Sequence, residues 1–415
     1  MRDMKDSGIK WAGQIPENWR INKGKYFMWV LERPVKDDDG VITCFRDGEV
    51  TLRSKRREDG FTIATVEAGY QGIEPGDLVV HGMDGFAGAI GISDSRGKGT
   101  PALNVLDCTE NKRYIMYLLR TMAYTEVFQA LATGIRVRTC DTNWKKLREL
   151  DYLLPPSSEQ QEIVSYVDRR CAELDSVASD IQSQIDMLEQ YKRSTITEAV
   201  TSGMNPDVEM KDSEIQWIGM MPAHWDCIRG KYILKYVQKP VREDDGVITC
   251  FRDGEVTLRS NRREDGFTMA DKEIGYQGID VGDLVVHGMD GFAGAIGISD
   301  SRGKASPVLN VLETAQNKRY IMYFLRSMAY SDVFLALATG IRVRSCDLRW
   351  NKLSELFYPI PPLEEQAAIV AHIDDVIEKT NAVIADKKAQ LETLEEYKKS
   401  LIFEYVTGKK EVPVS

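Results

Sequence analysis

The sequence has no run of about 18 apolar residues, the length that a membrane-spanning helix needs, and its first residues lack the apolar core of a secretory signal. We therefore expect a globular protein that works in the cytoplasm. The seven cysteines are odd in number and are never spaced as C-x-x-C, which predicts neither a disulfide framework nor a structural zinc site. The four histidines are scattered, so their spacing predicts no metal site.

An excess of basic residues is also missing. Asp and Glu (64) outnumber Lys and Arg (54), which gives a formal net charge of -10. Because phosphate binding favours a basic surface, this total argues against a nucleic-acid partner. Net charge averages over the whole molecule, however, whereas binding depends on the local potential. The total charge therefore leaves open both a DNA-binding protein and a scaffold that binds peptides or other proteins.

An internal repeat is the strongest feature that the sequence does contain. Residues 40–54 (GVITCFRDGEVTLRS) recur without change as residues 246–260, and residues 76–98 recur as residues 282–304. The same spacing relates Trp144 to Trp350, so no insertion separates the two copies. A repeat of this length predicts two equivalent structural units.

Each copy has two parts. The first part has short apolar runs such as Leu78-Val79-Val80 and 89–92 (AIGI), separated by Gly and Asp turns, which predicts a β-rich domain. Apolar positions over Tyr114–Ala132 predict a helix within it. The first part of each copy is therefore expected to be a mixed α/β globular domain.

The second part of each copy predicts a long helix. Pro155-Pro156 ends the domain, and the following Ser with Glu and Gln is typical of a helix start. Apolar residues then recur every three or four positions, which is heptad spacing and favours a coiled coil over an ordinary amphipathic surface helix. The expected seam residues are Val167, Cys171, Leu174, Ala178, Ile181, Ile185, Leu188, Thr195 and Ala199, and in the second copy Ile373, Ile377, Thr380, Ile384, Lys387, Leu391, Leu394, Lys398, Leu401 and Tyr405.

The order of these parts predicts a symmetric molecule. The first helix ends near residues 202–206 (SGMNP), a short connection, so the second domain is expected at the far end of that helix. The second helix buries its seam most simply by running back along the first. An antiparallel pair has a two-fold axis perpendicular to its length, so the two domains are expected to be inverted with respect to each other. Duplex DNA has such axes too, and two inverted half-sites would suit this symmetry.

The ordered motifs resemble the specificity subunits of type I restriction-modification enzymes, and the resemblance covers essentially the whole chain. These motifs are residues 6–11 (DSGIKW), 15–19 (IPENW), 217–219 (WIG), 221–225 (MPAHW), the two GDLVV runs, and 361–366 (PPLEEQ) before a long helix. The first copy departs from the pattern at residues 155–160 (PPSSEQ), where Ser-Ser replaces Leu-Glu.

This resemblance implies an α+β fold with two target-recognition domains, residues 1–154 and 204–360. They are separated by helical spacers, residues 155–203 and 361–410, that form an antiparallel coiled coil with pseudo-two-fold symmetry. It implies that each domain reads half of a bipartite DNA target. It also implies that the helices dock two methyltransferase subunits, which use S-adenosylmethionine, and that restriction subunits using ATP and Mg join the complex. This chain itself is expected to be non-catalytic and to bind no cofactor.

The sequence motifs agree with the expectation that this chain has no catalytic site. Asn205-Pro206-Asp207 does not supply the Asn-Pro-Pro-aromatic motif that holds a flipped adenine. Residues 91–98 have five residues between their glycines and are followed by Gly99 instead of the Ser or Thr of a phosphate loop. The sequence His81-Gly82-Met83-Asp84 and its copy pair a His with an Asp but lack a nucleophile, so a turn or a polar base contact is favoured over a duplicated enzyme site.

Basic residues in three repeated segments are the candidate DNA contacts, because Arg reads guanine edges and Lys and Arg hold phosphates. The first segment also contains acidic residues, so a salt-bridged hairpin is an equal alternative there. In the second segment glycines are expected to let a loop approach phosphate, and in the third alternate arginines are expected on one strand face. The candidates are Arg46, Arg53, Lys55, Arg56 and Arg57 with Arg252, Arg259, Arg262 and Arg263; Arg96 and Lys98 with Arg302 and Lys304; and Arg136 and Arg138 with Arg342 and Arg344.

Since the two domains share nearly every candidate contact, we expect them to read the same or nearly the same half-site in opposite orientations. The full target is then a palindrome or near-palindrome with an unspecified centre. Lys55 against Asn261 is the difference between the copies most expected to break this symmetry.

Overall fold

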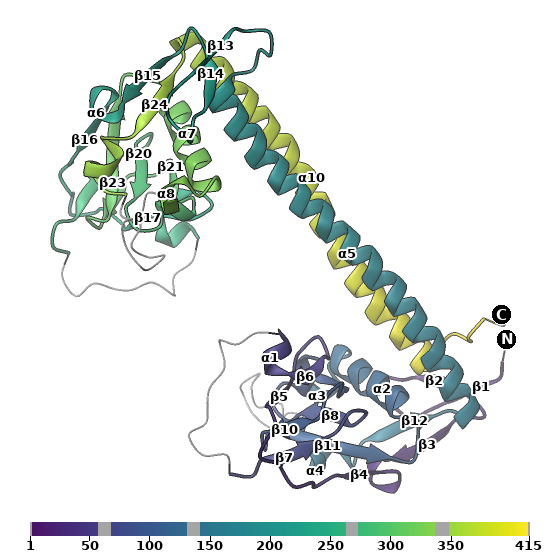
Figure 1. The fold of residues 1–415 in the computed structure, drawn as a ribbon. Helices are drawn as coiled ribbons and strands as arrows, with labels where there is room; N and C mark the ends of the chain where they lie inside the picture. Colours follow the sequence, from purple (N-terminus) through teal and green to yellow (C-terminus); the bar gives the residue numbers. More distant parts are fainter. Residues whose placement is uncertain (1, 57–67, 131–141, 263–272, 337–347, 414–415) are drawn as a thin grey trace. The chain divides into compact units, whose positions relative to one another are not determined.

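The structure is a computed structural model that describes residues 2–56, 68–130, 142–262, 273–336 and 348–413. The chain forms two compact units (Figure 1). Unit 1 contains Met1–Ile181 and Lys388–Ser415, and unit 2 contains Gln182–Lys387. Each unit therefore holds one globular domain together with a part of each of the two long helices.

The domain of unit 1 has short strands and short helices before its long helix. Its strands are β1 Met4–Asp6, β2 Gln14–Pro16, β3 Arg20–Lys23, β4 Met28–Val30, β5 Ile42–Cys44, β6 Val50–Leu52, β7 Gln71–Ile73, β8 Leu78–His81, β9 Ile90–Ile92, β10 Gly97–Gly99, β11 Leu103–Cys108 and β12 Asp151–Leu154. Its helices are η1 Gly24–Tyr26, α1 Arg53–Arg56, η2 Gly85–Ala87, α2 Lys112–Tyr124, α3 Val127–Ala130 and α4 Trp144–Leu147, followed by α5 Ser157–Ser202.

The domain of unit 2 repeats this order. Its strands are β13 Met210–Asp212, β14 Met220–Pro222, β15 Asp226–Arg229, β16 Leu234–Val237, β17 Ile248–Cys250, β18 Val256–Leu258, β19 Gln277–Ile279, β20 Leu284–His287, β21 Ile296–Ile298, β22 Gly303–Ala305, β23 Leu309–Thr314 and β24 Phe357–Ile360. Its helices are α6 Gly230–Ile233, η4 Arg259–Asn261, η5 Gly291–Ala293, α7 Lys318–Tyr330, α8 Val333–Ala336 and α9 Trp350–Leu353, followed by α10 Leu363–Val406.

A four-stranded antiparallel sheet forms the centre of each domain, in the order β4-β11-β8-β9 and β16-β23-β20-β21. Strand β8 is buried on both faces, which explains its continuous apolar sequence. Leu78 and Val80 face a core that includes Tyr114 of α2, whereas Val79 faces a smaller core that includes Ile42 of β5. The predicted mixed α/β domain with strands at residues 78–80 and 89–92 is therefore confirmed.

The helix predicted over Tyr114–Ala132 is interrupted. Helix α2 ends at Tyr124, and Glu126 then has a positive φ of 59°, after which α3 begins at Val127. Asp332 of unit 2 has a φ of 54° at the equivalent position. A left-handed residue ends the regular helical hydrogen bonding, so the apolar pattern continues across a break that it does not reveal.

The two long helices run antiparallel in each unit. In unit 1 the ring centroids of Tyr166 and Tyr405 are 4.6 Å apart, and Lys398 Nζ lies 2.6 Å from Asp175 Oδ1. In unit 2 Lys192 Nζ donates to Asn381 Oδ1 at 2.9 Å. As the residue number rises along α5, that of its partner on α10 falls. All the predicted seam residues are buried or half-buried, so the predicted antiparallel coiled coil is confirmed.

The ends of both long helices complete the cores of the domains. In unit 1 Leu401, Ile402, Tyr405 and Val406 of α10 belong to the same core as Trp19. In unit 2 the end of α5, with Ile196, Ala199 and Val200, takes the equivalent place. Each domain is thus packed between the start of the helix that follows it and the end of the other long helix.

Candidate nucleic-acid interface

The first candidate segment is the hairpin of β5 and β6. The two strands pair with Cys44 opposite Val50, and the turn between them is closed by a hydrogen bond from Phe45 N to Glu49 O of 2.8 Å. Gly48 has a φ of +91° in this turn, a conformation that glycine adopts without strain. The hairpin carries Arg46 in its turn and is followed directly by α1, which begins at Arg53.

The basic side chains of this hairpin have different partners. Arg46 is 68% exposed and donates through Nη2 to Asp84 Oδ1 at 2.8 Å. Arg56 stacks over the ring of Phe45 and pairs with the carboxylates of Asp47 and Glu49. The salt-bridged hairpin that the sequence offered as an alternative is therefore present around Arg56. Arg46 instead extends from the turn and, among the described residues, pairs with one carboxylate, that of Asp84.

The other two described candidates of this segment, Arg53 and Lys55, form hydrogen bonds with side chains of the same domain. Arg53 Nε donates to Thr43 Oγ1 at 2.9 Å, and Lys55 Nζ donates to Ser95 Oγ at 2.7 Å. Lys55 also pairs with Asp94 Oδ2 at 3.2 Å. These contacts hold Arg53 against strand β5 and Lys55 against the segment that follows β9.

Unit 2 repeats most of these contacts. Arg252 Nη2 donates to Asp290 Oδ1 at 2.9 Å, and Arg262 stacks over Phe251 and pairs with Asp253 and Glu255. Arg259 Nε donates to Thr249 Oγ1 at 2.9 Å. The copies differ at Asn261, which donates to Thr257 Oγ1 where Lys55 of unit 1 reaches Asp94 and Ser95.

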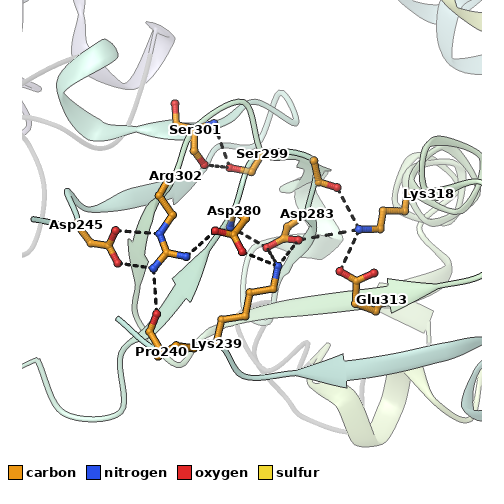
Figure 2. Close-up of polar contacts among 11 residues, drawn as sticks. Lys239, Pro240, Asp245, Asp280, Asp283, Ser299, Ser301, Arg302, Glu313 and Lys318 are labelled. Atoms are coloured by element: carbon orange, nitrogen blue, oxygen red, sulfur yellow. Dashed lines mark hydrogen bonds and ion pairs between the residues drawn. The ribbon is translucent and has the colours of Figure 1, made fainter. Parts of the chain in front are cut away.

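The arginine of the second segment belongs to an internal ion-pair network, shown for unit 2 in Figure 2. Arg302 binds Asp245 through Nε at 2.9 Å and Nη2 at 2.8 Å, and it also contacts Asp280 and the carbonyl oxygen of Pro240. Lys239 joins Asp280 to the buried Asp283 in the same network. The network ties together segments that are up to 62 positions apart in the chain.

Unit 1 builds the equivalent network with Arg96, Asp39 and Glu74. The hydrogen bonds from Arg96 lower the pKa of the Asp39 carboxyl to about 2, and the carboxylates raise the pKa of Arg96. Asp39 is buried, so its charge is stable only beside the guanidinium. These contacts give Arg96 and Arg302 a structural role in holding their domains together.

The prediction of a glycine loop around Lys98 and Lys304 is wrong, because both residues lie in strands. Gly97–Gly99 form strand β10, which pairs with β7, and Gly303–Ala305 form the equivalent β22. A Cβ at Gly97 would lie 2.5 Å from the carbonyl oxygen of Gly40, so this glycine allows two backbones to approach each other. Lys304 Nζ pairs with Glu273 Oε2 at 2.7 Å.

Six of the predicted contacts lie outside the described residues. They are Arg57, Arg136, Arg138, Arg263, Arg342 and Arg344. Their assignment as DNA contacts stays a prediction, as does the expectation that the third segment is a strand.

The His–Asp pairs noted in the sequence are turns that face the hairpin. His81 Nδ1 accepts hydrogen bonds from the backbone N–H of Met83 and of Asp84, at 3.2 and 3.0 Å. Burial lowers the pKa of His81, with the charge of Arg46 acting in the same direction and Asp84 opposing it. Asp84 in turn binds Arg46, a pairing that the sequence did not predict because the two residues are 38 positions apart.

The described residues also lack two kinds of feature. They contain no group of three or more His, Cys, Asp and Glu side chains that could hold a metal ion. Among them, none of the helices has the length and apolar character needed to cross a membrane.

Comparison with known proteins gives a curated relative and similar solved structures, although no protein-family model matches the chain. The chain is 23% identical, over 96% of its length and 95% of the other, to a Methanocaldococcus jannaschii protein described as "Putative type I restriction enzyme MjaX specificity subunit". A solved structure from a study of complex assembly and conformational transition of the type I R-M system covers 95% of this chain and 99% of its own, with a TM-score of 0.64 and 13% identity. The HsdS subunit of Thermoanaerobacter tengcongensis matches with a TM-score of 0.46 and 14% identity over 98% of this chain and all of its own.

The sequence match and the first structural match agree with each other, and each spans nearly the whole chain. The resemblance drawn from the sequence motifs is therefore confirmed: along almost its entire length the chain is similar to the specificity subunits of type I restriction-modification systems, and its fold is similar to that of the first solved structure.

Proposed function

We propose that this chain reads the DNA target of a type I restriction-modification complex and is itself non-catalytic. Its two domains would bind duplex DNA, and methylation of adenine would occur on methyltransferase subunits that supply S-adenosylmethionine. Restriction subunits that use ATP and Mg would join the same complex, with the cytoplasm as the expected location. The observation that carries the proposal is the repeated hairpin, with Arg46 and Arg252 exposed at the same point of each domain.

Two inverted copies of one recognition domain would give a bipartite target. The domains share their topology and most of the contacts around the hairpin, and the helices that connect them are antiparallel within each unit. We propose that a two-fold axis relates the domains. Each would then read the same or nearly the same half-site on opposite strands, on either side of an unspecified centre.

The long helices are the proposed dock for two methyltransferase subunits. Tyr191 of α5 and Tyr397 of α10 occupy equivalent positions, and both keep about half of their side chain exposed (55% and 48%). Exposed aromatic residues of this kind are common anchors at protein interfaces. The repeat of this feature on both helices suits two copies of one partner.

A scaffold that binds other proteins is the second candidate. The net charge of -10 and the ion pairs that neutralise Arg56 and Arg96 favour it. The salt dependence of binding separates the two functions, because DNA binding releases counterions and weakens steeply as salt rises. We expect the complex of this chain with its methyltransferase to lose duplex affinity by about tenfold or more between 50 and 200 mM salt.

The direct test is transfer of specificity. A host without adenine methylation should acquire methylated adenines at one defined target when this chain and its methyltransferase are expressed together. The methyltransferase alone should give no such target. Site-specific methylation in the absence of this chain would contradict the proposed function.

A further inference from the structure

A cluster of three side chains is repeated beside the hairpin of each domain. In unit 2 it comprises Arg252, His287 and Asp290, and in unit 1 Arg46, His81 and Asp84; we call it the Arg–His–Asp cluster. In unit 2 the cluster lines a cavity of about 560 Å³, together with Phe251 and Arg262. The side chains that line the cavity include donors, the two carboxylates of Asp253 and Asp290, and an aromatic ring, which suits a polar planar group.

The histidine of the cluster presents a fixed donor. His287 Nδ1 accepts hydrogen bonds from Met289 N at 3.2 Å and Asp290 N at 2.9 Å, so the ring hydrogen of the neutral form is on Nε2. Nε2 lies 3.9 Å from Asp290 Oδ2, beyond hydrogen-bonding distance. Within the described part of the chain, Nε2–H therefore has no acceptor. His81 has the same two backbone donors in unit 1.

The guanidinium of the cluster's arginine is oriented through one of its terminal nitrogens. Arg252 is 65% exposed, and within the described residues its guanidinium donates to Asp290 Oδ1 alone, through Nη2. This bond orients the planar group and leaves the Nε and Nη1 hydrogens and one Nη2 hydrogen for a ligand. Arg262 differs, because both of its terminal nitrogens bind carboxylates. Of the two arginines at the cavity, Arg252 is the one able to read a base.

We propose that Arg252 and Arg46 each read a guanine in the major groove of the target, with Asp290 and Asp84 as positioning residues and the His Nε2–H as a donor to an acceptor next to that base pair. The two N–H groups of an arginine match the N7 and O6 acceptors of guanine, a pattern that no other base presents. The inference rests on the proposed DNA-reading function. It adds that both half-sites contain a G·C pair at the same position, in inverted orientation.

The first test compares Arg252→Gln, Arg46→Gln and wild-type chains by mapping methylated adenines in cells that carry the methyltransferase. Arg252→Gln should relax the preference at one G·C pair of one half-site by about tenfold or more, and Arg46→Gln should relax the mirror position. Arg229→Gln is the matched control. Arg229 Nη1 also binds a carboxylate, Glu355 Oε2 at 2.8 Å, but Arg229 is on β15 and does not line the cavity.

A second test uses duplexes with 7-deazaguanine, which lacks the N7 acceptor, at the position identified by the first test. Binding by the wild-type complex should weaken, whereas Arg252→Gln should be insensitive to this change in its half-site. His287→Asn keeps an acceptor near the Nδ1 position and removes Nε2–H. It should therefore weaken binding of the target while the fold and the preference for the guanine read by Arg252 are retained.

The outcomes distinguish failure of the proposed function from failure of the guanine assignment alone. If the wild-type chain directs no site-specific methylation, the proposed function itself fails. If the wild-type target is mapped but Arg252→Gln leaves every base preference intact, only the assignment of guanine reading is overturned. Equal weakening on all duplexes would also overturn it, because that result identifies a phosphate contact.

Discussion

The hydroxyl group of Tyr114 lies 3.0 Å from the carbonyl oxygen of Val406, which links the first domain to the end of the last helix. In unit 2 the hydroxyl of Tyr320 lies 3.1 Å from the carbonyl oxygen of Val200. Both tyrosines are fully buried. Each hydroxyl also lies near a carbonyl oxygen of its own domain, Leu153 O at 3.0 Å and Pro359 O at 2.8 Å, so its one hydrogen is shared between the domain and the helix end. The same contact therefore joins each domain to the end of one long helix, although only Val200 directly precedes its domain in the chain.

Replacing Tyr114 by Phe removes the hydroxyl donor that lies near both Leu153 O and Val406 O. We expect a loss of about 1 kcal/mol in the free energy of unfolding, and a similar loss for Tyr320→Phe. Urea denaturation of both variants measures it. Tyr26→Phe is the control. Tyr26 is 72% exposed, so this substitution should leave the free energy of unfolding unchanged. Equal stability of all three variants would show that the contact carries no free energy.

Shortening the chain after Lys387 removes the part of α10 that packs into unit 1. Leu401, Ile402, Tyr405 and Val406 leave the core, and each buried side chain of this kind contributes about 1.5–3 kcal/mol. We expect the first domain to lose its cooperative unfolding transition, whereas the second domain keeps its transition because the end of α5 still covers it. Calorimetry resolves the two transitions, with a chain ending at Pro413 as the control. Two unchanged transitions in the shortened chain would refute the packing role.

The Asp39–Arg96 pair predicts a pH dependence of stability. The pKa of Asp39 is about 2 in the folded protein, below its ordinary value of 3.8, because Arg96 stabilises the ionised form. The stabilisation is therefore complete above the ordinary value and is lost as the pH falls towards about 2. The difference in unfolding free energy between wild type and Asp39→Asn should be largest near neutral pH and should shrink below about pH 4. A difference that stays constant with pH would contradict the ion pair.

Lys55 and Asn261 test the predicted symmetry of the target. Lys55 contacts Asp94 and Ser95, whereas Asn261 contacts Thr257, so this pair is a chemical difference between otherwise matching hairpins. If the wild-type target departs from a palindrome, Lys55→Asn should bring its two half-sites closer to identity. Lys5→Asn is a control outside the hairpin, because Lys5 binds backbone carbonyls near the start of the chain. The mapped target of each variant decides the question, and an unchanged asymmetry would assign it to other residues.

The sequence predicts the fold well where apolar residues recur at a regular spacing or form a continuous run. The heptad positions from Val167 to Tyr405 are buried or half-buried, and the run at Leu78 forms a doubly buried strand. The break at Glu126 has no such signal, because a left-handed residue interrupts a helix without interrupting its apolar pattern.

The candidate site is less visible in the sequence because its partners are distant along the chain. Arg46 and Arg96 are the same residue type in equally conspicuous repeats. Only the fold shows that Arg96 is held by Asp39, 57 positions away, while Arg46 is exposed on Asp84. The antiparallel helices predict that the end of the second helix reaches the first domain, but not that the residues after 387 form one compact unit with it.

The inverted arrangement of the two domains can be tested by mapping methylated adenines across a genome, in cells that express this chain with its methyltransferase. Two copies of one recognition domain, set in opposite directions, should produce one target with two identical or nearly identical half-sites on opposite strands and a fixed, unspecified centre. Two unrelated half-sites, or half-sites repeated in the same direction, would contradict the inverted arrangement.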